Sequence, residues 1–297
     1  MCNNFKGVEL KMKRVHLLPN VITAFGLSCG LFVIFKMTMT EVGGASYQVL
    51  TAAAGILLLA AVADLLDGAV ARAMKAESEF GGLFDSLADA ISFGVAPSVI
   101  VLKSLSVLPG TELSFFLTTA ATIYSVCGVL RLVRFNITAT QVKGDVELSN
   151  ASKKNFTGLP IPAAAAAIVS GNLFLTSDEF KSFFSLNEEV RTWIMIMQLV
   201  VVGYFMISRW KFPSMKTLHI RVASFQLVFF TVIGAVVIFY GLLHHFALVF
   251  FVCAWGYLVV ALILSIIRII SGKKSKTLED FEPEAEEDVD EEINLKG

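Results

Sequence analysis

Runs of about 20 apolar residues recur along the whole chain, and they constrain its fold more than any other feature. A helix of that length crosses the hydrocarbon core of a bilayer. Charged residues make up 16% of the 297 residues, below the roughly 25% that is typical of a soluble domain. The runs also lack the strict alternation that membrane strands need. We therefore predict an all-α fold, a polytopic membrane helix bundle.

Eight runs are long enough to be counted as spans. They lie at residues 17–37, 47–71, 82–106, 113–133, 159–176, 192–208, 221–241 and 246–267. The predicted organisation is an N-terminal segment at 1–16, a membrane core at 17–216, two additional spans within 217–270 and a tail at 271–297. Ten Asp and Glu lie between residues 279 and 297 against one Lys, so we expect this tail to be disordered.

The basic residues predict how the spans are oriented. With eight alternating spans, 20 of the 24 Lys and Arg fall on one side of the membrane. Only Lys36, Lys103, Lys181 and Arg191 fall on the other side. Because cytoplasmic loops carry the excess of basic residues, we expect both termini in the cytoplasm. The expected location is the cell inner membrane, with membrane lipid around the spans and no nucleic acid as a partner.

Four carboxylates lie inside two adjacent spans, Asp64 and Asp67 in the second and Asp85 and Asp89 in the third. At about 100° per residue, each pair shares one face of its helix with small residues. The two spans run in opposite directions, and at about 1.5 Å per residue all four acids lie within about 12 Å of the cytoplasmic boundary. The sequence therefore predicts that the four carboxylates meet.

Four carboxylates in a low-dielectric setting need a cation. If they instead joined helices as ion pairs, basic residues would be needed at the same depth, and the spans contain almost none there. Oxygen ligands favour magnesium or manganese, and pairs of such ions serve phosphoryl chemistry. We predict a site for two divalent ions. An ion-coupled transporter is an alternative, although the chain shows neither inverted repeats nor broken helices.

The first span contains the sequence Gly26-Leu27-Ser28-Cys29-Gly30, which fits two motifs. A G-x-S-x-G hydrolase nucleophile needs a strand–turn–helix elbow, which a spanning helix does not provide. A G-x-x-x-G pattern forms a face on which another helix packs closely. We therefore interpret these glycines as a packing face.

The pattern Asp64-x2-Asp67-Gly68-x2-Ala71-Arg72-x8-Gly81-x3-Asp85-x3-Asp89 resembles the signature of the CDP-alcohol phosphotransferase family at all eight positions. The resemblance implies a six-helix core, a homodimer and transfer of a phosphatidyl or related group from a CDP-linked donor to an alcohol, with release of CMP. It implies metal ligation by Asp64, Asp67, Asp85 and Asp89, with Asp89 also the catalytic base. It implies contacts to the CDP donor from Asn20, Thr23, Gly68, Ala71, Arg72 and Gly81.

Further segments resemble the phosphatidylserine synthase branch of this family. They are Ser92–Pro97, Arg131–Asn136, Phe156–Pro162 and Ser208–Ser214. The resemblance implies CDP-diacylglycerol as donor and L-serine as acceptor. The acceptor candidates are Arg131, Arg134 and Asn136, since a guanidinium binds a carboxylate in a bidentate manner. Which arginine contacts serine stays open. A sister enzyme that uses glycerol 3-phosphate or inositol phosphate is the nearest alternative.

Overall fold

The computed structural model describes residues 2–74, 76, 78–142, 156–184, 186–208, 211–212, 241 and 244–270. These residues form helices together with one pair of two-residue strands. The elements are α1 (Cys2–Thr38), α2 (Tyr47–Ala73), α3 (Glu79–Asp89), the π-helical turn η1 (Ala90–Val95), α4 (Ala96–Ser104), α5 (Glu112–Val142), β1 (Phe156–Thr157), α7 (Ile161–Thr176), α8 (Asp178–Phe183), α9 (Glu188–Ile207), β2 (Lys211–Phe212) and α11 (Phe246–Ile270).

Six segments of the described chain are long and apolar enough to cross a membrane, which confirms the predicted membrane helix bundle. They are Leu17–Thr38, Tyr47–Ala73, Glu79–Ser104, Glu112–Ile137, Glu188–Ile207 and Phe246–Ser265. Each coincides with a predicted span to within a few residues. The predicted span at 159–176 is the shorter apolar helix Ile161–Thr176. The predicted span at 221–241 lies outside the described residues except for its last position.

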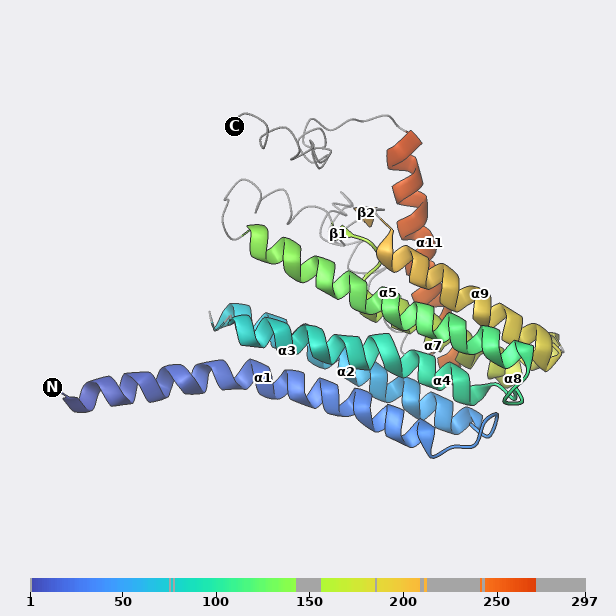
Figure 1. The fold of residues 1–297 in the computed structure, drawn as a ribbon, viewed down its shortest axis with the longest axis horizontal. Helices are drawn as coiled ribbons and strands as arrows, with labels where there is room; N and C mark the ends of the chain where they lie inside the picture. Colours follow the sequence, from blue (N-terminus) through green and yellow to red (C-terminus); the bar gives the residue numbers. More distant parts are fainter. Residues whose placement is uncertain are drawn as a thin grey trace, which may run out of the picture.

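The helices α1, α3, α5 and α9 run side by side, and α3, η1 and α4 follow one another as a single rod (Figure 1). Helix α1 packs mainly against α2, and α5 packs mainly against α9. Helix α11 packs on α7 and crosses the others steeply in this view. The alternation of directions places the end of α2, the start of α3 and the end of α5 at the same end of the bundle.

Small side chains bring the helices of the core close together. The alanine-rich helix α7 buries Ala164, Ala167 and Ile168 completely, in one core cluster with Leu199 of α9 and Tyr124 of α5. Small residues of this kind let membrane helices approach closely, so that dispersion contacts hold the bundle together. The core therefore fixes how α5, α7 and α9 lie relative to one another.

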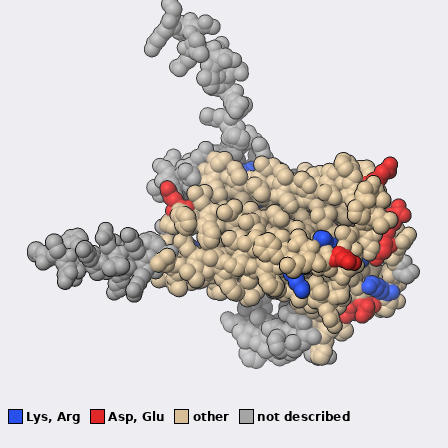
Figure 2. All heavy atoms as spheres, turned by 60° about the horizontal axis from the view of Figure 1, so that its bottom comes forward, with Lys and Arg blue, Asp and Glu red and all other residues tan. Residues whose placement is uncertain are grey.

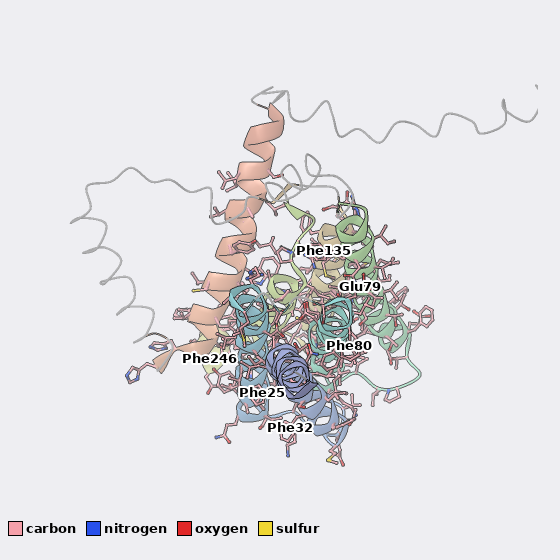
Figure 3. The ribbon with its side chains drawn as sticks, turned by 90° about the vertical axis from the view of Figure 1, so that its left-hand side faces the viewer. Phe25, Phe32, Glu79, Phe80, Phe135 and Phe246 are labelled. Atoms are coloured by element: carbon pink, nitrogen blue, oxygen red, sulfur yellow. The ribbon has the colours of Figure 1, made fainter. Side chains whose placement is uncertain are left out.

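The outer surface of the bundle is apolar. Phe25, Phe32, Phe80 and Phe135, labelled in Figure 3, are 50%, 57%, 68% and 54% exposed. On the face seen in Figure 2, most of the acidic and basic side chains gather toward the right-hand end, and the middle carries few charges. A soluble protein rarely exposes so much contiguous apolar surface. With the six span-length helices, this surface identifies an integral membrane protein.

The two short strands join the segment before α7 to the segment after α9. Phe156 pairs with Phe212 in antiparallel register. Next to this pair Gly158 adopts a φ of +86°, and a Cβ at this position would lie 2.5 Å from the backbone oxygen of Met206. Only glycine fits such a position easily. The backbone N–H of Leu159 donates to the oxygen of Phe205 at 3.1 Å, so this segment closes onto the last turn of α9.

Candidate active site and metal-binding cluster

Three of the four predicted carboxylates converge where α2 and α3 lie side by side. Asp64, Asp67 and Asp85 each offer an oxygen atom, and these atoms all lie within 4.8 Å of one another. Asp67 is buried, with 5% of its surface exposed, and the other two are half-buried. The two helices thus form one acidic cluster from residues that are 18 to 21 positions apart in the sequence.

Asp89 borders the same cavity but is not part of this close group of three. The cavity has a volume of about 10 Å³ and is also lined by Thr23, Gly26 and Ser92. A space of this size is near the minimum that holds one water molecule. It therefore suits a small ion, and a nucleotide lipid could reach the acids only from outside. Asp89 thus lines the cavity together with the other three acids, while those three form the closest group.

The acidic cluster fits a hard divalent cation. Two ion pairs within 4.0 Å occur in the described part of the chain, Arg191–Glu188 and His245–Glu179, and neither includes these acids. The residues described around the cavity include neither Lys nor Arg. Oxygen atoms are the ligands that such cations prefer. The cluster can therefore hold a metal ion, and it does not act as ion-pair glue between the helices.

Helix α1 supports the cluster from the side. The buried hydroxyl of Thr23 donates to Oδ2 of Asp67, which orients that carboxylate. Oδ1 of Asn20 lies 3.1 Å from the position that a Cβ on Gly81 would take, so Asn20 packs against the first turn of α3. Both predicted donor-binding residues on α1 therefore contact the helices that carry the acids.

The predicted donor contacts on α2 lie next to Asp67. Gly68, Ala71 and Arg72 follow it within five positions, on the last turns of the helix. Nη1 of Arg72 lies 3.4 Å from the position of a Cβ on Gly68, so the exposed arginine folds back over that glycine. Gly81 precedes Asp85 by about one turn and is half-buried. The guanidinium thus lies at the end of the bundle that holds the cluster.

The three acceptor candidates on α5 have different surroundings. Nδ2 of Asn136 donates to the hydroxyl of Ser86 at 3.0 Å, and Nη1 of Arg134 donates to the backbone oxygen of Ile207 at 3.4 Å. Nε of Arg131 is buried and has no hydrogen-bond partner among the described residues. Arg131 lies close enough to Asp89 for their charges to interact. Of the three, Arg131 is the residue with an unused donor near the acids.

Sequence reasoning missed two features of this site. The π-helical turn η1 begins directly after Asp89, and the hydroxyl of Tyr124 on α5 donates to its Phe93 oxygen. Pro97, four residues after Phe93, was the signal that could have indicated an irregular helix there. The second feature is Tyr257 of α11, which lies near Arg131, one of the acceptor candidates. No local pattern in the sequence points to this long-range contact.

Comparison with known proteins places this site in a family. A family model described as CDP-alcohol phosphatidyltransferase matches residues 16–204. A CDP-diacylglycerol–serine O-phosphatidyltransferase of Helicobacter pylori (strain ATCC 700392 / 26695) is 31% identical over 258 residues, which cover 84% of this chain and 96% of the relative. A protein of the same name from Bacillus subtilis (strain 168) is 30% identical over 203 residues, 68% of this chain and 93% of the relative.

A third relative gives a shorter match of the same kind. The Saccharomyces cerevisiae protein with this name is 33% identical over 160 residues, 53% of this chain and 54% of its own length. The family model spans the four aspartates and the three acceptor candidates, and it ends before α11. The chain belongs to the CDP-alcohol phosphatidyltransferase family.

Proposed function

We propose that this enzyme transfers the phosphatidyl group of CDP-diacylglycerol to the hydroxyl of L-serine, giving phosphatidylserine and CMP. The observation that carries the proposal is the cluster of Asp64, Asp67 and Asp85 beside Asp89 and Arg131. The cluster suits a diphosphate held through divalent cations, and the arginine suits an acceptor that bears a carboxylate. The relatives that match most of the chain carry the name of this serine-specific activity.

The four aspartates are the proposed ligands of magnesium or manganese, two ions per site. Asp64, Asp67 and Asp85 are already close enough to share an ion, and Asp89 borders the same cavity. Bound divalent ions would neutralise the charge on the donor diphosphate and make its phosphorus easier to attack. The Thr23 hydroxyl would keep the Asp67 carboxylate turned toward the other two acids.

The donor is proposed to lie over the ends of α2 and α3, against Asn20, Thr23, Gly68, Ala71, Arg72 and Gly81. Glycine and alanine leave the helix backbones accessible to a bulky nucleotide. Thr23 contacts Asp67 directly, so its effect on the donor would pass through that carboxylate. The guanidinium of Arg72 would balance the charge that develops on CMP as it leaves.

The acceptor is proposed to bind between Asp89 and Arg131. Arg131 would hold the serine carboxylate, and Asp89 would take the proton from the serine hydroxyl. The serine oxygen then forms a bond to the phosphorus that bears the diacylglycerol, and the bond from that phosphorus to the CMP oxygen breaks. Arg134 and Asn136 would hold the end of α5 in place through their bonds to α9 and α3.

The proposed placement has both termini and the active site at the cytoplasmic face of the inner membrane, in a homodimer. The distribution of basic residues supports this orientation. The family core is proposed to span 17–216, between the segment 1–16 and two additional spans within 217–270. The tail at 271–297 lies outside the described residues.

The direct test supplies purified protein with CDP-diacylglycerol and one alcohol at a time, and measures CMP release and the lipid product. We expect release with L-serine, and far less with glycerol 3-phosphate or inositol phosphate. Release with one of those alcohols but not with serine would identify a sister enzyme. If no alcohol supports release in the presence of magnesium or manganese, the proposed function is wrong.

A further inference from the structure

The turn that follows Asp89 has an unusual hydrogen-bond pattern. Residues Ala90–Val95 form the π-helical turn η1, and the N–H of Ala96 donates to the oxygen of Ile91, five residues earlier. This turn lies between α3, which carries two of the acids, and α4. A π turn inside a longer helix is uncommon and is found frequently at functional sites. The contacts that maintain η1 therefore influence where Asp89 points.

Pro97 explains why the turn requires hydrogen-bond donors from another helix. Proline has no N–H, so an α-helix through this position would leave the carbonyl oxygen of Phe93 without its usual donor. The hydroxyl of Tyr124, on α5, donates to this oxygen at 2.9 Å. The neighbouring hydroxyl of Ser125 lies 2.9 Å from the oxygen of Gly94 and can donate to it. Tyr124 is completely buried, so water cannot replace its bond.

The face of α5 that contacts the turn also carries Arg131, whose charge acts on Asp89. Tyr124 and Arg131 are seven residues apart, close to two turns of helix, so they lie on one face. Phe93 follows Asp89 by about one turn, and α3 and α5 run in opposite directions (Figure 1). The Tyr124–Phe93 hydrogen bond therefore joins α5 to the turn about two helical turns from Arg131, whose positive charge acts on the Asp89 carboxylate.

Close packing between α5 and η1 fixes the position of α5 along the turn. A Cβ on Gly128 of α5 would lie 3.6 Å from Cα of Gly94 and 3.0 Å from Cδ1 of Ile161. The two backbones therefore approach without side chains between them, and Ile161 of α7 fills the remaining space. A sliding movement of α5 along η1 would break the Tyr124 bond and this packing together.

We propose that Tyr124 is a positioning residue, whose hydroxyl holds the π turn and thereby fixes the carboxylate of Asp89 relative to Arg131 and the acidic cluster. The inference rests on the proposed function for the roles of Asp89 and Arg131. Tyr124 itself touches neither the acids nor the cavity they line. Its effect is to replace the helix hydrogen bond that Pro97 removes.

The test compares Tyr124→Phe with a control on the same helix, Thr122→Val. The hydroxyl of Thr122 donates to the oxygen of Thr118 within α5, 2.9 Å away, and is exposed. For each purified full-length variant, Mn²⁺ binding is titrated without substrate, and kcat is then measured with CDP-diacylglycerol and serine. For Tyr124→Phe we expect an unchanged number of Mn²⁺ sites, about tenfold or more weaker binding, and a kcat lower by about ten- to hundredfold. Thr122→Val should change neither quantity.

Two results would overturn the proposal. One is wild-type Mn²⁺ affinity in Tyr124→Phe. The other is a loss of sites at unchanged affinity, which would mean that the residue only supports folding. If Tyr124→Phe gives no folded protein, Ser125→Ala decides, because weaker Mn²⁺ binding supports the proposal and unchanged binding contradicts it. A wild-type protein that binds Mn²⁺ but does not use serine would refute the proposed function alone, since the Mn²⁺ comparison does not need the substrate.

Discussion

Replacing Gly30 by alanine tests the contact between α1 and the π turn. A Cβ at Gly30 would lie 2.7 Å from Cβ and 2.8 Å from Cα of Ser92. Because the second of these is a backbone atom, a change of side-chain rotamer cannot relieve the clash. Gly26, in the same G-x-x-x-G pattern, has ordinary spacing, since its Cβ would lie 3.5 Å from that of Ala63. A Cβ at Gly55 would have no neighbouring atom within 4 Å.

The three glycines allow the cost of the clash to be isolated. Alanine favours a helix over glycine by about 0.8–1.0 kcal/mol, and all three substitutions share this gain. Overpacking of a tight core contact costs about 1–3 kcal/mol. We therefore expect Gly26→Ala and Gly55→Ala to be neutral or stabilising. Gly30→Ala should be less stable than either by about 1–3 kcal/mol, which is the overpacking cost alone.

The assay is reversible unfolding in mixed micelles, with all variants measured under the same conditions. Gly30→Ala should also lower kcat, because Ser92 follows Asp89 by three residues and would move with the turn. Equal stability of the Gly30 and Gly26 variants would refute the close approach of α1 to η1.

Three further predictions concern other parts of the chain. Thr23→Val removes the donor to the acidic cluster, and a Mn²⁺ titration should show about tenfold weaker binding; unchanged affinity would contradict that role. Gly158→Ala should destabilise the protein by more than Gly110→Ala in the unfolding assay. Both glycines have a φ of +86°, but only at Gly158 would the new Cβ lie within 4 Å of a neighbouring backbone. Equal losses of stability would contradict this prediction. The carboxyl of Glu179 has a pKa below its ordinary 4.5, because hydrogen bonds from its own backbone N–H and then from His245 stabilise the charged form. The contribution of this carboxylate to stability is therefore complete above pH 4.5. It is lost as the pH falls through the lowered pKa. Glu179→Gln should therefore cost at most about 0.5 kcal/mol near neutral pH and nothing in acid, and a loss that persists in acid would refute the electrostatic cause.

The membrane spans and the meeting of the acids could be predicted from the sequence because both depend on local periodicity. Run length identifies a span, and the opposite directions of two adjacent helices fix the relative heights of Asp64, Asp67 and Asp85. The four acids were expected to form one group, whereas the structure places Asp89 beside a tighter cluster of three. Helix spacing gives heights along an axis, but side-chain distances also depend on how the helices rotate and pack.

The surroundings of the acceptor candidates could not be predicted in the same way. Arg131 and Arg134 are equivalent in the sequence, three residues apart at the end of one span. Their tertiary neighbours differ. Arg134 donates a hydrogen bond to the backbone of α9, whereas Nε of Arg131 has no partner among the described residues. The position of Tyr257 depends on how α11 packs against α7, more than 100 residues from Arg131. No local pattern contains that information.

The most direct test of the central claim is CMP release by purified protein with CDP-diacylglycerol and L-serine, in wild type and in Asp85→Asn. Because Asp85 is the one residue from α3 in the cluster of three, its replacement should weaken Mn²⁺ binding and abolish both CMP release and phosphatidylserine formation. A chelator should abolish wild-type activity, and added magnesium or manganese should restore it. Serine-dependent release that persists in Asp85→Asn, or that survives chelation, would contradict the claim that the carboxylate cluster performs the transfer through divalent cations.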